Sequence, residues 1–193
     1  HRGRRRHHHA DPGRQMKPEI IETPRLILRK ARPEDAVDLH DAMSRPEAMR
    51  YWTRPAHERL DETEGFVARM IVGEVGGKAD DFVIVSRDQG RVIGKAGAWN
   101  LPEVGFLLHP GFWGMGLAHE AMAAVVDHLF RWHGPEHLTA EADPRNAGSL
   151  RLLARLGFRE THRAERTLLW GEEWCDSVYL ALPRADWSGR PDA

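Results

Sequence analysis

Two glycines, Gly114 and Gly116, lie in a short loop between an apolar segment at 104–108 and an amphipathic segment at 118–130. Glycine adopts positive φ angles without steric cost, so backbone N–H groups in such a loop can converge without side chains in the way. The helix that the amphipathic segment predicts would add the positive end of its dipole at the same place. This arrangement predicts a binding site for a pyrophosphate or another phosphate-bearing group.

Better-known phosphate loops fit this segment poorly. A Walker A loop requires Gly-Lys-Ser or Gly-Lys-Thr, and the segment contains neither. A dinucleotide-binding fingerprint would need Gly or Ala three residues after Gly116, where His119 stands, and its strand would come earlier in the chain. A glycine loop that only turns the chain is the structural alternative.

The elements that must position this loop follow from apolar periodicity and turn signals. Asp88-Gln89-Gly90 is a hairpin turn signal between two apolar stretches, and Gly157 is typical of the residue that ends a helix. The strand–helix–strand unit around the loop implies a right-handed crossover with local parallel pairing. We expect strands at 26–31, 82–86, 92–99, 104–108, 138–142, 167–170 and 177–182, with helices at about 33–43, 61–71, 118–130 and 146–156. This order predicts one mixed α/β sheet.

The segment from Trp113 to Ala121 reads Trp-Gly-x-Gly-x-Ala-x-Glu-Ala. It resembles motif A of the GNAT superfamily of N-acetyltransferases, in the form typical of the ribosomal-protein N-terminal acetyltransferase (RimJ/RimL-like) branch. The resemblance covers about 20–187 and implies a GNAT fold, which is an α/β fold with a mixed central β-sheet of six to seven strands and about four helices. Further pieces that resemble this branch follow in the expected order at 23–29, 103–106, 146–149, 156–158 and 176–178.

The resemblance implies direct transfer of acetyl from acetyl-CoA to a primary amine, without a covalent enzyme intermediate and without a metal. The strand that ends in Phe106, Leu107 and Leu108 would splay from its neighbour, pair with the pantetheine arm and polarise the thioester carbonyl through a backbone N–H. The backbone of the glycine loop would hold the pyrophosphate through Gly114, Met115, Gly116, Leu117 and Ala118.

Two polar residues of the following helix are assigned by the same resemblance. Asn146 would bond the pantetheine, and Ser149 would protonate the leaving thiolate. Both residues also suit a helix start, where Asn is a favoured N-cap and Ser is common in the first turn. The sequence departs from the family at Leu153, where many members carry a Tyr as the thiolate acid, and at Trp113, where Gln or Arg often begins motif A. Ser149 is therefore the candidate acid, and the lack of a defined acid is the alternative.

A general base must take a proton from the ammonium form of the acceptor amine. Glu103, at the head of the strand before the glycine loop, is the predicted base by resemblance, and a solvated strand-end acid is its structural alternative. His109 is a second candidate. Glu120 lies in the first helical turn, where an acid suits the helix dipole, and we expect it to be structural because it would repel phosphates.

The loop at 51–57 corresponds to the segment that lines the acceptor pocket in this branch. Trp52 would form an apolar wall, and Arg54 would meet a carboxylate or a peptide carbonyl. An aromatic core residue beside an exposed arginine is the structural alternative for this pair.

The composition limits the partners and the location. The chain has 193 residues, which is one ordinary domain that we place at 16–193, and its formal net charge of -1 gives no general reason to expect a nucleic-acid or membrane partner. Residues 1–15 are rich in Arg and His without apolar periodicity, and we interpret them as a leader or tag-like extension. No apolar run is long enough to span a bilayer, so a cytoplasmic location is expected.

Three further features of the sequence are its single cysteine, a pair of histidines and its tryptophans. Cys175 is the single cysteine, so an internal disulfide is excluded, and we expect a small buried hydrophobe there. His133 and His137 have helical spacing, but Gly134-Pro135 breaks any helix between them, so we expect no metal site. Seven tryptophans are compatible with some exposed apolar surface and with a homodimer.

The acceptor stays open at the level of sequence. The first hypothesis is acetylation of a protein or peptide N-terminus, and the second is acetylation of a small amine such as an antibiotic, a polyamine or an amino-acid derivative. The third is a CoA-binding regulatory module without catalysis. An acidic groove with room for an extended chain would favour the first hypothesis, and a closed small pocket would favour the second. An acceptor side that lacks both an accessible carboxylate and a channel to the thioester would favour the third.

Overall fold

A single eight-stranded sheet forms the centre of the computed structural model, which describes residues 15–187. The strand order is β1-β2-β3-β4-β5-β6-β8-β7. Only β5 and β6 pair in parallel, and the other neighbours pair antiparallel. The strands are β1 (Ile20–Glu22), β2 (Leu26–Arg29), β3 (Asp80–Ser86), β4 (Arg91–Asn100), β5 (Glu103–Leu108), β6 (His137–Ala142), β7 (Arg159–Trp170) and β8 (Glu173–Pro183).

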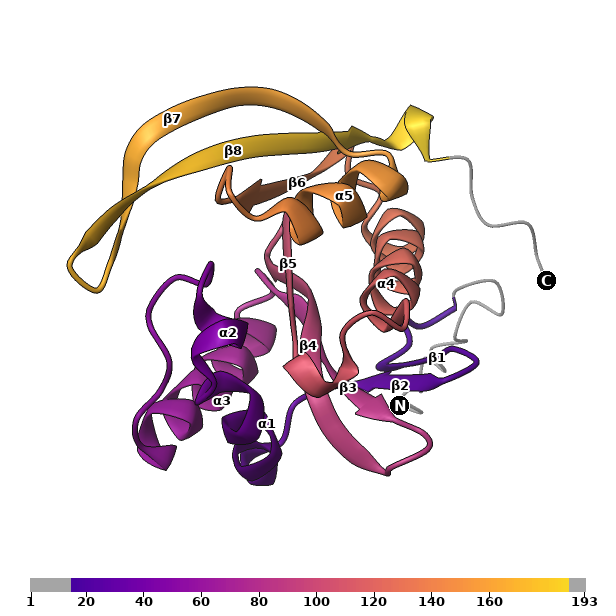
Figure 1. Cartoon of the computed structure of the whole chain (residues 1–193). Coiled ribbons are helices and arrows are strands. Elements are labelled where there is room, and N and C mark those ends of the chain that lie inside the picture. The colour runs from indigo at the N-terminus through magenta and orange to yellow at the C-terminus, as the bar shows by residue number, and fades with distance from the viewer. Residues whose placement is uncertain (1–14, 188–193) are drawn as a thin grey trace, which may run out of the picture.

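Helices cover both faces of the sheet (Figure 1). On one face lie α1 (Ala36–Met43), α2 (Pro46–Met49) and α3 (Leu60–Val75), and on the other lie α4 (Leu117–His133) and α5 (Ala147–Leu156). The main hydrophobic core lies between the sheet, α4 and α5, and two smaller clusters lie under α1, α2 and α3. This is a mixed α/β sheet covered by helices on both faces, as the sequence predicts.

The alternation of side chains in β5 shows how the sequence builds the two layers. Val104 and Leu108 are buried in the main core beside α4, whereas Leu107 belongs to the cluster formed with Met43 and Met49 on the opposite face. Successive side chains of a strand point to opposite faces, so β5 is anchored on both sides. A strand fixed in this way can keep one backbone edge open to a ligand.

That open edge arises where β5 and β6 separate. Their only register pair is Glu103 with Thr139, and no pairing follows it along the rest of β5. On its other edge β5 pairs with β4 as far as Leu108. The splay that was expected for 106–108 is therefore present, and it leaves the β6-facing edge of this segment without a strand partner.

The helix ends match the residue types in the sequence. Gly116 (φ 77°) precedes α4 and Gly134 (φ 58°) ends it, both in the left-handed region that favours glycine. Asn146 caps α5 by accepting the Ser149 N–H at 3.2 Å, and Gly157 (φ 102°) ends that helix. These local signals explain why the helices were predicted close to their actual bounds.

Two elements are additional to the predicted seven strands and four helices, and one predicted strand is longer than expected. β1 and α2 are too short to show a periodic pattern, and they are additional elements. β7 begins at Arg159 instead of 167, because its first half is exposed at an edge of the sheet and carries polar side chains without apolar alternation. With β8 it forms a long ribbon that arches over the end of the molecule towards α2 (Figure 1).

Two expectations concern the chain as a whole. The predicted leader at 1–15 lies, apart from Gln15, outside the described residues. Within 15–187, no helix combines the length and the apolar character that crossing a membrane requires.

Candidate active site

A cleft of about 970 Å³ lies between the splayed strands β5 and β6 and reaches the surface. Its volume is at the upper end of the usual range for small-molecule sites, so it has room for more than one substrate. The cleft opens to solvent beside α2 and the end of β6, because three of its lining residues there are exposed: Glu47, Tyr51 and Glu141. The elements that line it are α2 with the loop after it, β5, the glycine loop, the start of α4, the end of β6, and α5.

The glycine loop forms one end of this cleft. Gly114 (φ 78°) and Gly116 (φ 77°) are both left-handed, and a Cβ placed on Gly114 would meet nothing within 4 Å. The helical hydrogen bonds of α4 begin with the Glu120 N–H, which donates to the Gly116 carbonyl at 3.0 Å. The N–H groups of Leu117 and Ala118 therefore have no helical acceptor, and they lie at the positive end of a 17-residue helix. A phosphate fits this position.

Arg25 fixes the glycine loop from outside, a role that was not predicted from the sequence. Its Nη1 donates to the Met115 carbonyl at 2.8 Å, and its Nε pairs with the Glu120 carboxylate at 2.8 Å. Met115 is therefore the one predicted loop residue that does not line the cleft. Glu120 also accepts from the Thr23 hydroxyl at 2.6 Å and from the Arg25 backbone at 2.9 Å.

Glu120 thus points away from the cleft, as expected for a structural residue. Burial alone would raise the pKa of Glu120, but the hydrogen bonds from Thr23 and Arg25 outweigh it and lower the pKa. We predict that Glu120→Ala lowers the free energy of unfolding by about 1–3 kcal/mol, because it leaves the buried Thr23 hydroxyl without this acceptor and releases the exposed Arg25 side chain. Urea titration measures this change, and Glu64→Ala, at an exposed position of α3, is the control. Equal effects of the two changes would contradict the anchoring role.

The segment 106–108 and the start of α5 form the middle of the cleft. Phe106, Leu107 and Leu108 all line it, together with Asn146 and Ser149. The Trp113 indole donates to the Leu108 carbonyl at 2.9 Å, which ties the glycine loop to the end of β5. The structure thus brings the predicted donor-site residues together, with Met115 outside the lining.

The cap and the helix of α5 carry the residues that were predicted to bond the pantetheine and to protonate the thiolate. Asn146 uses its side-chain oxygen as the helix cap, and Ser149 is half-buried at the wall of the cleft. Leu153 lines the cleft with an apolar side chain, so it cannot donate a proton to the thiolate. Arg151 and Arg155 also line the cleft from α5, and they are cationic groups suited to a phosphate-bearing ligand that the sequence analysis missed.

Two carboxylates line the cleft, Glu47 of α2 and Glu141 of β6, whereas Glu103 lies outside the lining. Glu103 is half-buried beside Trp99, and burial raises its pKa, with the charge of Glu141 adding to the rise and a hydrogen bond from Trp99 opposing it. Both side chains lie on the same face of the sheet, because Glu103 is in register with Thr139, two residues before Glu141.

His109, the second predicted base candidate, forms its hydrogen bonds outside the cleft. His109 Nε2 lies 3.0 Å from Asp41 Oδ2, and its Nδ1 accepts the Gly111 N–H at 2.9 Å. Asp41 is held mainly by a hydrogen bond from Arg45, followed by one from Arg91, and these contacts lower its pKa to about 2. His109 does not line the cleft.

On the acceptor side the structure separates the two predicted residues. Trp52 lines the cleft and packs edge-on against Phe66, with 6.3 Å between ring centroids. Arg54 does not line the cleft, because its guanidinium pairs with Glu62 at the start of α3. Arg50 lines the cleft in its place, with its guanidinium 5.2 Å from the centre of the Tyr51 ring.

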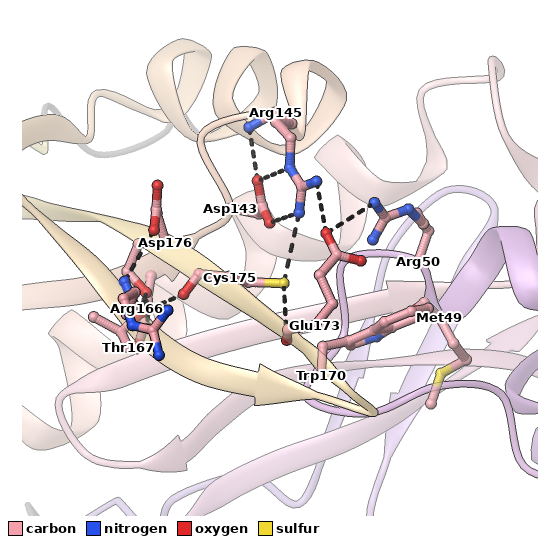
Figure 2. A network of polar contacts seen from close by, with 12 residues as sticks. Met49, Arg50, Asp143, Arg145, Arg166, Thr167, Trp170, Glu173, Cys175 and Asp176 are labelled. Atoms are coloured by element: carbon pink, nitrogen blue, oxygen red, sulfur yellow. Dashed lines mark hydrogen bonds and ion pairs between the residues drawn. The ribbon is translucent and has the colours of Figure 1, made fainter.

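A polar network joins this wall to the β7–β8 ribbon (Figure 2). Glu173 lies 2.9 Å from Arg145 Nη1 and 3.6 Å from Arg50 Nη2, and Arg145 also holds Asp143 through two nitrogens. The Trp170 indole donates to the carbonyl of Met49 in α2 at 3.0 Å. The tip of the ribbon is therefore fixed against the acceptor wall, by contacts that no local pattern in the sequence could reveal.

Comparisons with known proteins identify the family of this chain. A family model described as "Acetyltransferase (GNAT) domain" matches residues 25–159. The chain is 25% identical over 173 residues to the uncharacterized N-acetyltransferase YnaD of Bacillus subtilis (strain 168), covering 87% of this chain and 99% of that protein. It is 29% identical over 182 residues to the [ribosomal protein uS5]-alanine N-acetyltransferase of Escherichia coli (strain K12), covering 87% and 92%.

A solved structure supports the fold. The ribosomal L7/L12 α-N-protein acetyltransferase RimL in complex with coenzyme A superimposes with a TM-score of 0.75 at 19% identity, covering 87% of this chain and 99% of that chain. The family model spans more than half of the 193 residues and includes the whole glycine loop. The chain is therefore an N-acetyltransferase that belongs to the acetyltransferase (GNAT) domain family and resembles its ribosomal-protein-alanine acetyltransferases.

Proposed function

We propose that this N-acetyltransferase uses acetyl-CoA to acetylate the free amino terminus of a peptide or protein. The observation that carries the proposal is the continuity of the cleft, which runs from the glycine loop past the open edge of β5 to an acceptor wall at the surface. A carboxylate, Glu141, lines the acceptor end, which suits a cationic amine and argues against a module without catalysis.

The residues present fit the donor. Left-handed Gly114 leaves open space beside the start of α4, so backbone N–H groups of the loop can hold a pyrophosphate. The open edge of β5 offers backbone groups to the amides of the pantetheine arm, and Asn146 and Ser149 lie beside it. When bound, acetyl-CoA supplies an acetyl group activated as a thioester.

The acceptor end supports a peptide over an enclosed small amine. The lining there includes exposed side chains from α2 and β6, so a chain entering the cleft can extend into solvent. The Escherichia coli relative is named for acetylating the alanine terminus of a ribosomal protein, and it aligns with 87% of this chain. Arg50 and the Tyr51 ring would contact the first peptide groups after the amine.

A comparison of acceptors by thiol release tests this assignment. We expect the peptide amide Ser-Ala-Ala-Ala to show a kcat/KM roughly tenfold or more above those of spermidine and glycinamide, which is about 1.4 kcal/mol of additional binding along the extended chain. A preference for spermidine would identify a small-amine acetyltransferase instead. Binding of CoA without turnover of any of the three amines would indicate a regulatory CoA-binding module.

A further inference from the structure

Glu141 projects into the cleft from the end of β6. Its neighbours Leu138 and Ala140 are buried in the main core beside α4, so the side chain of Glu141 points to the opposite face, where α1, α2 and α3 lie. If the pairing of Glu103 with Thr139 continued, Gly105 would stand opposite Glu141. Gly105 also lines the cleft and has no side chain, so β5 places nothing between Glu141 and the open strand edge.

A chain of two hydroxyl groups orients this carboxylate. The buried Ser177 hydroxyl donates a short hydrogen bond to Glu141 Oε1, and the Thr167 hydroxyl lies 2.5 Å from Ser177 Oγ and 3.2 Å from the Cys175 carbonyl. Because Ser177 gives its one proton to Glu141, the single Thr167 proton is shared between Ser177 Oγ and the Cys175 carbonyl. Among the residues that the structure describes, Glu141 Oε2 has no hydrogen-bond partner.

We propose that Glu141 binds the ammonium group of the acceptor and takes its proton, with Ser177 and Thr167 as positioning residues. The assignment rests on the proposed function and names the acceptor-side base within it. It replaces Glu103, which lies outside the cleft lining, with a carboxylate that lines the cleft and keeps one oxygen free.

In the proposed transfer the ammonium nitrogen loses two protons and the thioester loses its sulfur as a thiolate. The carboxylate of Glu141 accepts one proton from the ammonium, and the neutral amine nitrogen then attacks the carbonyl carbon of the acetyl thioester. The C–N bond forms, the C–S bond breaks, and the sulfur leaves with the electron pair. The nitrogen then loses a second proton, and this proton neutralises the thiolate. Ser149 lines the cleft, and its hydroxyl carries the proton to the sulfur. Glu141 is exposed and returns its proton to solvent.

The charged and titratable groups around Glu141 define its pH dependence. Glu103 of β5 lies on the same face of the sheet as Glu141. Tyr179 of β8 is the register partner of Glu141, and the His162 ring of β7 stacks on the Tyr179 ring with 4.4 Å between centroids. From the side of α2, the cleft is lined by Glu47 and Arg50. The hydrogen bond from Ser177 favours the ionised form of Glu141.

The test compares Glu141→Gln with the wild type, using Ser-Ala-Ala-Ala amide as acceptor. We expect kcat/KM to fall by roughly 100-fold to 10,000-fold and its decline at acid pH to disappear, because the group that must be ionised is gone. The affinity for CoA, measured by calorimetry, should change less than twofold. Glu165→Gln removes an equivalent charge at an exposed position of β7 and should leave kcat/KM and the pH profile unchanged.

Ser177→Ala separates positioning from a general loss of folding. We expect the acidic limb of the kcat/KM profile to move to higher pH in this variant, an effect that simple destabilisation would not produce. A wild type that acetylates none of the amines refutes the proposed function, and with it the role of Glu141. An active wild type together with a Glu141→Gln variant that keeps its rate and its acidic limb overturns only the assignment of Glu141.

Discussion

Replacement of Asp80 by alanine is expected to lower the free energy of unfolding by about 3–5 kcal/mol, the usual cost of removing one partner from a buried charge cluster. Asp80 is fully buried at the start of β3. Its Oδ2 lies 2.7 Å from His128 Nε2 and 2.8 Å from His133 Nε2, and its Oδ1 pairs with Lys30 Nζ at 2.5 Å. The variant leaves these three groups without their common acceptor.

This cluster also explains where His133 lies. His133, paired in the sequence analysis with His137, instead meets His128 and Asp80, and these three side chains converge closely enough to hold a metal ion. Lys30, and Lys17 at 3.3 Å, already neutralise the carboxylate, so we interpret the group as an ion-pair cluster that joins the N-terminal segment, β3 and α4. Its contribution to folding is therefore electrostatic and should depend on pH.

The pH dependence has a definite sign. Burial alone would raise the pKa of Asp80, but hydrogen bonds from His128, Lys30 and His133 together hold it well below its usual range. A group with a depressed folded-state pKa stabilises the protein fully above its unfolded pKa, which is about 3.9 for Asp, and this stability is lost as the pH falls towards the folded value. The wild type should lose stability from about pH 5 downwards more steeply than Asp80→Ala does.

Urea titrations at neutral pH and along this acid range measure both effects. Asp61→Ala is the matched control, since Asp61 forms an exposed pair with Arg59, and its expected change is within about 0.5 kcal/mol. An Asp80→Ala variant as stable as the Asp61→Ala control would show that the cluster contributes nothing to the fold.

The second large effect is expected at Gly116, where valine should weaken CoA binding by roughly tenfold or more, or about 1.4 kcal/mol. At φ 77° a β-branched side chain is strained, so the loop must change its backbone conformation. A Cβ at this position would also stand 3.5 Å from Arg25 Nη2, beside the contact that holds the Met115 carbonyl. The Cβ contact itself is of ordinary length, so it is the change of backbone conformation that displaces the N–H groups at the start of α4.

Gly90→Val provides a matched control for backbone strain. Gly90 has φ 64°, its Cβ position is open, and it lies in the turn between β3 and β4, away from the cleft. Both variants should lower the thermal midpoint, but only Gly116→Val should weaken CoA binding in calorimetry. Unchanged CoA affinity in a folded Gly116→Val variant would mean that the loop only turns the chain.

The parts of the fold that the sequence predicted are those with local causes. Gly116, Gly134 and Gly157 mark helix ends through their own backbone preferences, and Asn146 caps α5 through a bond to a residue three positions later. The order of elements predicted a mixed α/β sheet, and the resemblance of residues 113–121 to motif A implied the GNAT fold, which the family model and the solved relatives confirm.

The parts that were missed depend on contacts between distant residues. Glu141 and Ser177 are 36 positions apart, and Trp170 and Met49 are 121 apart, so no window of sequence shows that they meet. Arg54 pairs with Glu62, and Arg50, directly after α2, lines the cleft instead. The homodimer and the cytoplasmic location stay predictions.

The most direct test of the account is mass spectrometry of a peptide that carries one free amino terminus and one lysine, after incubation with the enzyme and acetyl-CoA. We predict one added acetyl group, located on the α-amine, and none when acetyl-CoA is omitted. An unmodified peptide in the presence of bound acetyl-CoA, or an acetyl group found only on the lysine, would contradict the assignment of this cleft to amino-terminal acetylation.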